Sequence, residues 1–176
     1  SDSKSIKNLS LTKRISLEQL SNNQLKLSDI TSVAIHPSNQ YVAVAAPADP
    51  VTDAGYVVFI SHDGTYLNHV QVGSLPDMVT FTPNGKLALV ANEGEPNAEY
   101  TIDPVGSVSI IDVSNGVQAL TNNHITTAGL DKLDATGIRI VKPGASFSED
   151  AEPEYIVVSD DSSKAYVALQ ESNAIA

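Results

Sequence analysis

Cysteine and tryptophan are both absent from this chain of 176 residues. Without cysteine, the protein has neither a disulfide framework nor a metal site built on thiolates. Basic residues are also few, with 10 Lys and Arg against 21 Asp and Glu and a formal net charge of −11. A protein that binds nucleic acid needs a positive surface to replace the counterions of the phosphates. The composition therefore argues against a nucleic-acid partner and favours cations or basic partners.

Long apolar runs are missing as well. No stretch approaches the roughly 20 apolar residues that span a bilayer as a helix, so we expect no membrane span. Apolar residues with helical periodicity do not follow the strand-like segments, which argues against a TIM barrel or a doubly wound fold. The glycine-rich signatures of nucleotide binding and the G-x-S-x-G signature of a serine nucleophile are absent too. These absences favour an all-β fold and assign neither a cofactor site nor a catalytic residue.

One pattern occurs three times in the chain. It begins at Ile30 as "ITSVAIHPSNQYVAVAAPADP", at Pro76 as "PDMVTFTPNGKLALVANEGEP" and at Pro153 as "PEYIVVSDDSSKAYVALQESN". Each copy is a short apolar strand, a polar turn and a second alternating strand, which is typical of a β-hairpin. Pro37 and Pro83 hold the same turn position 46 residues apart, within the roughly 40 to 50 residue period of propeller blades.

Two further strands are predicted after each of the first two hairpins, around the turns in residues 62–64 and 114–116. Four antiparallel strands per repeat predict an all-β fold, a β-propeller fragment of about two to three four-stranded antiparallel blades, whose ring this chain alone does not close. We therefore expect the remaining blades in a second segment or chain. The predicted parts are a lead-in strand segment (1–29), a blade (30–75), a blade with a long acidic loop (76–120), an insertion (121–152) and the start of a further blade (153–176).

The repeats also carry a family resemblance. The phrases "VGSLPDMVTFTPNGKLALVANEGEPNAEYTIDPVGSVSIIDV" and "EPEYIVVSDDSSKAYVALQESNAIA" resemble the choice-of-anchor I family of bacterial secreted or surface β-propellers. This family belongs to the wider group of YVTN and surface-layer propellers, and its members are often labelled alkaline phosphatase-like. The resemblance implies a longer parent protein that is secreted or located at the cell surface, and it leaves the biochemical role open.

Acidic residues gather in the loops at one predicted face of the blades. The repeats place Asp77 and Glu154 at the same position before the innermost strand, and Glu93, Glu95 and Asp103 follow the second strand of one blade. We call these five residues the acidic face. Hard cations such as calcium take about six to eight oxygen ligands, whereas clustered acids without a cation raise one another's pKa. We therefore predict a site for calcium or another divalent cation, with solvated or turn-capping loop acids as the other interpretation.

Three functions follow from these features. The first is an exported or cell-surface propeller that binds a protein or small-molecule ligand through the acidic face, together with a divalent cation. The second is a metal-dependent phosphoesterase, in which metals would clamp a phosphoryl group and activate water. Its nearest basic candidates, Arg139 and Lys142, depend on how the insertion folds. The third is a structural component of a surface layer or a larger assembly.

Overall fold

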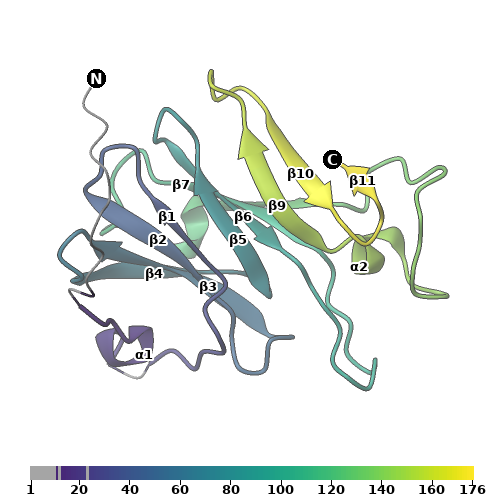
Figure 1. Ribbon diagram of the computed structural model, residues 1–176, viewed down its shortest axis with the longest axis horizontal. Helices are drawn as coiled ribbons and strands as arrows, with labels where there is room; N and C mark the ends of the chain where they lie inside the picture. The colour runs from purple at the N-terminus through teal and green to yellow at the C-terminus, as the bar shows by residue number, and fades with distance from the viewer. Residues whose placement is uncertain (1–10, 12, 23) are drawn as a thin grey trace.

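The computed structural model describes residues 11, 13–22 and 24–176, and these form three antiparallel sheets in chain order (Figure 1). The first sheet contains β1 (Ser32–Ile35), β2 (Tyr41–Ala46), β3 (Ala54–Ser61) and β4 (Tyr66–Ser74). The second contains β5 (Pro76–Phe81), β6 (Leu87–Asn92), β7 (Ser107–Asp112) and β8 (Ile125–Gly129). The third contains β9 (Pro153–Val158), β10 (Ala165–Leu169) and β11 (Ala174–Ile175). The fold is therefore an all-β propeller fragment, as predicted, and these three sheets do not close a ring.

The predicted hairpins form because their turns suit the backbone. In the second sheet, Gly85 takes a φ of 69°, and the side-chain oxygen of Asn84 accepts hydrogen bonds from the Thr82 hydroxyl and the Lys86 N–H. Glycine enters this left-handed region without a steric penalty. The strand register then repeats from sheet to sheet, with the equivalent pairs Val33↔Val44, Val79↔Val90 and Ile156↔Val167.

The sheets pack face to face through apolar side chains and leave β1, β5 and β9 as successive neighbours. Phe59 of the first sheet packs with Val79 and Ile111 of the second, and we call this interface the first junction. Leu89 of the second sheet packs with Ile156 of the third, and we call this interface the second junction. Burial of these aliphatic and aromatic side chains supplies the driving force that holds the sheets together.

The fourth strand of the second sheet is β8, which lies inside the segment predicted as an insertion, so the strand predicted at residues 117–120 was wrong. Val117 and Leu120 are buried in the first junction. The side-chain amide of Asn68 donates hydrogen bonds to the carbonyl groups of both residues. Because these carbonyls bond to a side chain, residues 117–120 do not pair as a strand, and the short 3-10 helix η1 (Asn122–His124) leads into β8.

The lead-in strand segment predicted at 1–29 lies partly outside the described residues, which exclude 1–10. Its described part forms helix α1 (Leu17–Leu20), where the side chain of Ser16 caps the N-terminus, and only Leu27 makes an isolated β-bridge. Leu17 and Leu25 are buried against the outer face of the first sheet. The other helix, α2 (Phe147–Asp150), precedes β9. Among the described residues, no helix is long and apolar enough to cross a membrane.

Candidate functional site

Asp77 and Glu154 occupy the same position in the second and third sheets. Each follows the proline that begins an innermost strand, and each is the extra residue of a β-bulge, because the strand pairing skips it. The residues before the two prolines, Leu75 and Glu152, both have a positive φ, of 45° and 42°. A bulge leaves its extra residue without a pairing partner and bends the strand. Because of the bulge, these two half-buried carboxylates do not follow the regular alternation of side chains between the two faces of the strand.

Glu93 and Glu95 lie just beyond the end of β6. The N–H of Glu93 donates a hydrogen bond to the carbonyl of Leu75 at 2.9 Å, which ties the start of the loop to the start of β5. Gly94 has a φ of 75°, and a Cβ at this position would lie 2.8 Å from backbone atoms of the 105–106 segment. Only glycine fits here. The turn leaves Glu93 half-buried and Glu95 exposed.

The segment between β8 and β9 folds back onto this loop. Asp150 is buried, and its carboxylate accepts hydrogen bonds from the N–H groups of Val141 at 2.5 Å and Lys142 at 2.7 Å. This places the Lys142 ammonium against the carboxylate of Asp103, 5.2 Å from the ring centre of Tyr100. The second oxygen of Asp103 is buried without a hydrogen-bond partner. Lys142 is thus a basic residue held within the acidic site.

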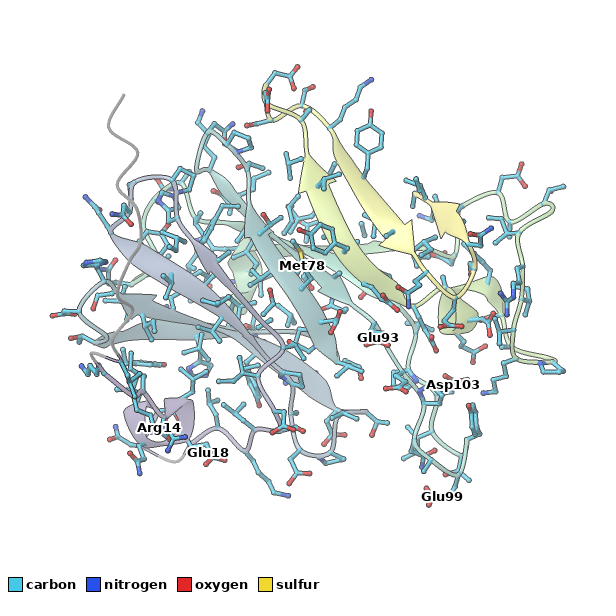
Figure 2. All side chains as sticks on the ribbon, viewed as in Figure 1. Arg14, Glu18, Met78, Glu93, Glu99 and Asp103 are labelled. Atoms are coloured by element: carbon cyan, nitrogen blue, oxygen red, sulfur yellow. The ribbon has the colours of Figure 1, made fainter. Side chains whose placement is uncertain are left out.

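An acidic pocket of about 220 Å³ lies between the loop after β6, the segment that precedes β9, and Glu171, which follows β10. It contains six carboxylates and one ammonium group among the residues that line it, which are Glu95, Pro96, Tyr100, Asp103, Val141, Lys142, Glu149, Asp150, Glu152 and Glu171. Figure 2 shows Glu93 and Asp103 near this end of the second and third sheets, with Glu99 farther out on the loop. Glu18 lies on α1 and Arg14 lies near that helix, and both are well away from the acidic pocket.

Glu93 has the most perturbed acidity in this region. Burial, together with the negative charges of Asp77, Glu95, Glu152 and Glu154, raises its pKa to about 8. A carboxylate that loses water without gaining a positive partner is held more easily in its neutral form. Glu93 therefore binds a proton up to neutral pH unless a cation replaces that proton.

The third sheet and the residue before it contribute a second set of perturbed acids. Burial, together with the negative charges of Glu171, Glu95, Asp150 and Asp103, raises the pKa of Glu152 to about 7. Burial also raises the pKa of Glu154, to which the charges of Asp77 and Glu171 add, and burial raises the pKa of Asp77. Carboxylates from two adjacent sheets thus face one another across the second junction.

The structure brings the charges of the predicted acidic face close together, but it does not arrange these residues as a set of metal ligands. Glu93 senses the charges of three of the other predicted residues, whereas Asp103 acts on Glu152 and pairs with Lys142. Among the described residues, no three Asp, Glu or His side chains are arranged to hold a metal ion. Cation binding by Asp77, Glu93, Glu95, Asp103 and Glu154 therefore stays a prediction.

Sequence reasoning did not include Glu152 and Asp150 in the site. Glu152 had a detectable signal, because it precedes Pro153 as Leu75 precedes Pro76 in the aligned repeats. The equivalent blade has leucine at this position, so the fold itself does not require an acid there. Asp150 had no such signal, since the segment before it has no counterpart in the other repeats.

The equivalent positions of the first sheet are neutral or paired. Thr31 takes the place of Asp77, and its hydroxyl donates a hydrogen bond to the carbonyl of Pro76 at 2.6 Å across the first junction. Pro47 takes the place of Glu93 and is fully buried. Asp49 takes the place of Glu95, and its carboxylate lies 3.3 Å from the ammonium of Lys26. Unpaired carboxylates are therefore not a general requirement of these blades.

Three successive antiparallel sheets with carboxylates at one junction define a β-propeller segment with an acidic face. The model of the choice-of-anchor I domain matches residues 1–176, and the chain belongs to this family. Family membership implies a surface-anchored or secreted protein. No curated protein matches the chain.

Among solved structures, the chain is similar to one described as "Crystal structure of the eukaryotic initiation factor". The sequence identity is 15% and the TM-score is 0.48. The match covers 82% of this chain and 26% of the other, so the chain spans about a quarter of the length of that structure.

Proposed function

We propose that this chain is part of a surface-associated propeller that binds a divalent cation, such as calcium, at the second junction and presents a ligand-binding surface there. One observation carries the proposal. At equivalent positions the first junction uses Thr31 and Pro47, whereas the second uses Asp77 and Glu93, whose pKa is raised to about 8. The blade architecture does not need these charges, so we attribute them to the binding of a positively charged ligand.

A cation at this place would link the second sheet to the third. Its candidate ligands come from β5 and the loop after β6 on one side, and from β9 and the residue before it on the other. Carboxylate oxygens are the ligands that calcium prefers. Binding would remove the mutual repulsion of the acids and restrain residues 93–106 and 141–152. These two segments line most of the acidic pocket, so the cation would also fix the surface offered to a protein or small-molecule partner.

Thermal unfolding after chelation and re-addition of calcium, magnesium or zinc tests the proposal. A ligand present at about 100 times its Kd stabilises the folded state by about 2.7 kcal/mol. For a chain of this size, that corresponds to an increase in Tm of about 5–10 °C. Glu93→Gln should abolish most of the increase, whereas Glu99→Gln, on the exposed loop tip, should retain it. If no cation changes the Tm of the wild-type protein, the cation site is refuted.

A metal-dependent phosphoesterase remains the second candidate because of one specific observation. Lys142 lies within the acidic pocket, where an ammonium group could neutralise part of a phosphate's charge. Hydrolysis of p-nitrophenyl phosphate should then require an added divalent cation and should fall strongly in Lys142→Gln. Cation-dependent stabilisation without any turnover would leave only the binding function.

A further inference from the structure

The two oxygens of the Asp103 carboxylate have different surroundings. One oxygen pairs with the ammonium of Lys142, and the other is buried without a hydrogen-bond partner among the described residues. The side chain as a whole is only 12% exposed. A buried carboxylate oxygen without a donor is costly, because it has lost its water and gained no partner in return. Asp103 thus presents an unfilled acceptor at the wall of the acidic pocket.

Lys142 bonds to only one of these oxygens, whereas a guanidinium group matches both. An ammonium is a compact point charge, but the planar guanidinium of arginine carries a fork of donors that fits the two oxygens of a carboxylate. The ring of Tyr100 lies at the same place, with its centre 5.2 Å from the Lys142 ammonium. Aromatic faces attract cations, and guanidinium groups stack on them. The surroundings of Asp103 therefore suit a guanidinium better than the ammonium they hold.

The acidic pocket has the size and the charge to take one basic side chain. Its volume of about 220 Å³ is below the roughly 300–1,000 Å³ of pockets that hold drug-sized ligands. Its six carboxylates outnumber its single ammonium group, so a further positive charge reduces the repulsion that remains. Ile102, next to Asp103 in the chain, is 54% exposed and offers an apolar contact beside the pocket. These features suit an arginine that another polypeptide presents.

We propose that the acidic pocket binds an arginine side chain of a partner protein, and that Lys142 occupies the arginine position in the absence of that partner. The proposal rests on the ligand-binding surface proposed above and names the chemistry of its ligand. In the complex, the guanidinium donates to both oxygens of Asp103 and stacks on Tyr100. A divalent cation can keep Asp77 and Glu93 as ligands at the same time, because neither residue lines the pocket.

Lys142 can leave this position without disturbing the pocket. Its side chain is 31% exposed, so the ammonium can turn into water. Its backbone N–H stays hydrogen-bonded to the buried carboxylate of Asp150 at 2.7 Å, which holds the segment in place. Lys142 is thus a tethered competitor that partly neutralises the free pocket and weakens the binding of the partner. Its replacement by a neutral residue should therefore raise the affinity for arginine.

NMR titration of the isotope-labelled chain with Nα-acetylarginine amide, in chelator and again in calcium, tests the proposal. The amide signals of residues 95–103 and 141–152 should shift. The citrulline analogue, which has the same shape without the charge, should cause no shifts, and the lysine analogue should bind more weakly. Asp103→Asn should weaken binding of the arginine analogue about 10-fold. Lys142→Gln should strengthen it by up to about fivefold. Glu99→Gln, on the exposed loop tip, should leave it unchanged.

Equal binding of the arginine analogue and either of the other two analogues would overturn the proposal. So would an unchanged affinity in Asp103→Asn or weaker binding in Lys142→Gln. The same spectra show whether each variant is folded, and Lys142→Gln keeps the test decisive if Asp103→Asn does not fold. The result is separate from that of the cation experiment. A chain that a cation stabilises but that does not bind the arginine analogue refutes the arginine site alone, whereas arginine binding without a cation response refutes only the cation site.

Discussion

The two junctions of this molecule share a backbone design and differ in their chemistry. Both join an innermost strand to its neighbour through repeated apolar pairs. The first is completed by the hydroxyl of Thr31, which bonds to the carbonyl of Pro76. The second places Asp77, Glu93 and Glu154 at the corresponding edge, and the pKa of each is raised. A neutral hydrogen bond is thus enough at the first junction. The second junction instead contains carboxylates whose mutual repulsion destabilises the folded state.

The difference separates residues that the fold needs in both junctions from residues that only one junction contains. The apolar residues recur in both junctions because each pair of sheets must exclude water. The carboxylates occur in one junction only, and in the absence of a cation they repel one another. Clusters of groups with raised pKa are a recognised mark of functional sites. The comparison therefore assigns the apolar pairs to the architecture and supports the proposal that the acids bind a cation.

The largest effect should come from the apolar part that both junctions share. Ile156→Ala removes a side chain that is 1% exposed in the second junction and should cost about 2–5 kcal/mol in the free energy of unfolding. Urea denaturation gives this value. Val157→Ala, one residue away at an exposed position of β9, should change it by less than about 0.5 kcal/mol. A small effect of Ile156→Ala would mean that apolar packing does not hold the second junction.

The pH dependence of stability should come next and should arise at the second junction. The folded-state pKa values of Glu93, about 8, and Glu152, about 7, lie above the ordinary value of 4.5, so the folded state holds protons that the unfolded state has released. In chelator, the free energy of unfolding should therefore fall as the pH rises from about 4.5 to about 8, by about 2 kcal/mol after solvent screening.

Glu93→Gln should flatten this pH profile and should raise the stability measured at pH 9. A saturating cation should flatten the wild-type profile in the same way, because it favours the charged form of the acids. Unchanged pH profiles in both experiments would contradict the assignment of repulsion to this junction.

A smaller effect should follow from breaking the neutral link of the first junction. Thr31→Val removes the hydroxyl that bonds to Pro76 and should cost about 1 kcal/mol, the net worth of one hydrogen bond. The increase in Tm caused by a cation should not change, because that response belongs to the other junction. Thr127→Val, at an exposed position of β8, is the matched control. Loss of the cation response in Thr31→Val would show that the junctions are coupled.

The smallest effect should come from Lys142, the positively charged side chain in the acidic pocket. Lys142→Gln removes the ammonium paired with Asp103 and should change the free energy of unfolding only slightly, because the Lys142 side chain is partly exposed. It should also tighten calcium binding, since a competing positive charge is gone. Isothermal titration with calcium measures this change in Kd. Weaker binding would mean that Lys142 positions Asp103 instead of competing with the cation.

Local patterns predicted the hairpins well and the connecting segments poorly. The turn at Asn84-Gly85 and the alternation around it fix one hairpin, and the repeats extend it to the other sheets. The interval from Val117 to Leu120 also looks like a strand, but its apolar side chains fill the first junction as a loop. Apolar residues that face a core produce the same sequence pattern in a strand and in a loop. Helix α1, at four residues, is too short to show a period.

The acidic site was predictable to the extent that it is repeated. Alignment placed Asp77 and Glu154 at one structural position, and their β-bulges confirm that equivalence. The place of Lys142 was not predictable, because it depends on the two hydrogen bonds that Asp150 makes in a segment unique to the third repeat.

The sequence by itself determined the blade architecture and the family, because strand pairing depends on alternation and turn residues that lie within a few positions of each other. The tertiary structure decided that Glu93 and Glu154 share one partly buried junction, and that both have raised pKa values. Desolvation and repulsion between charges depend on distances between segments about 60 residues apart in the chain. Only the packing of the second sheet against the third sets those distances.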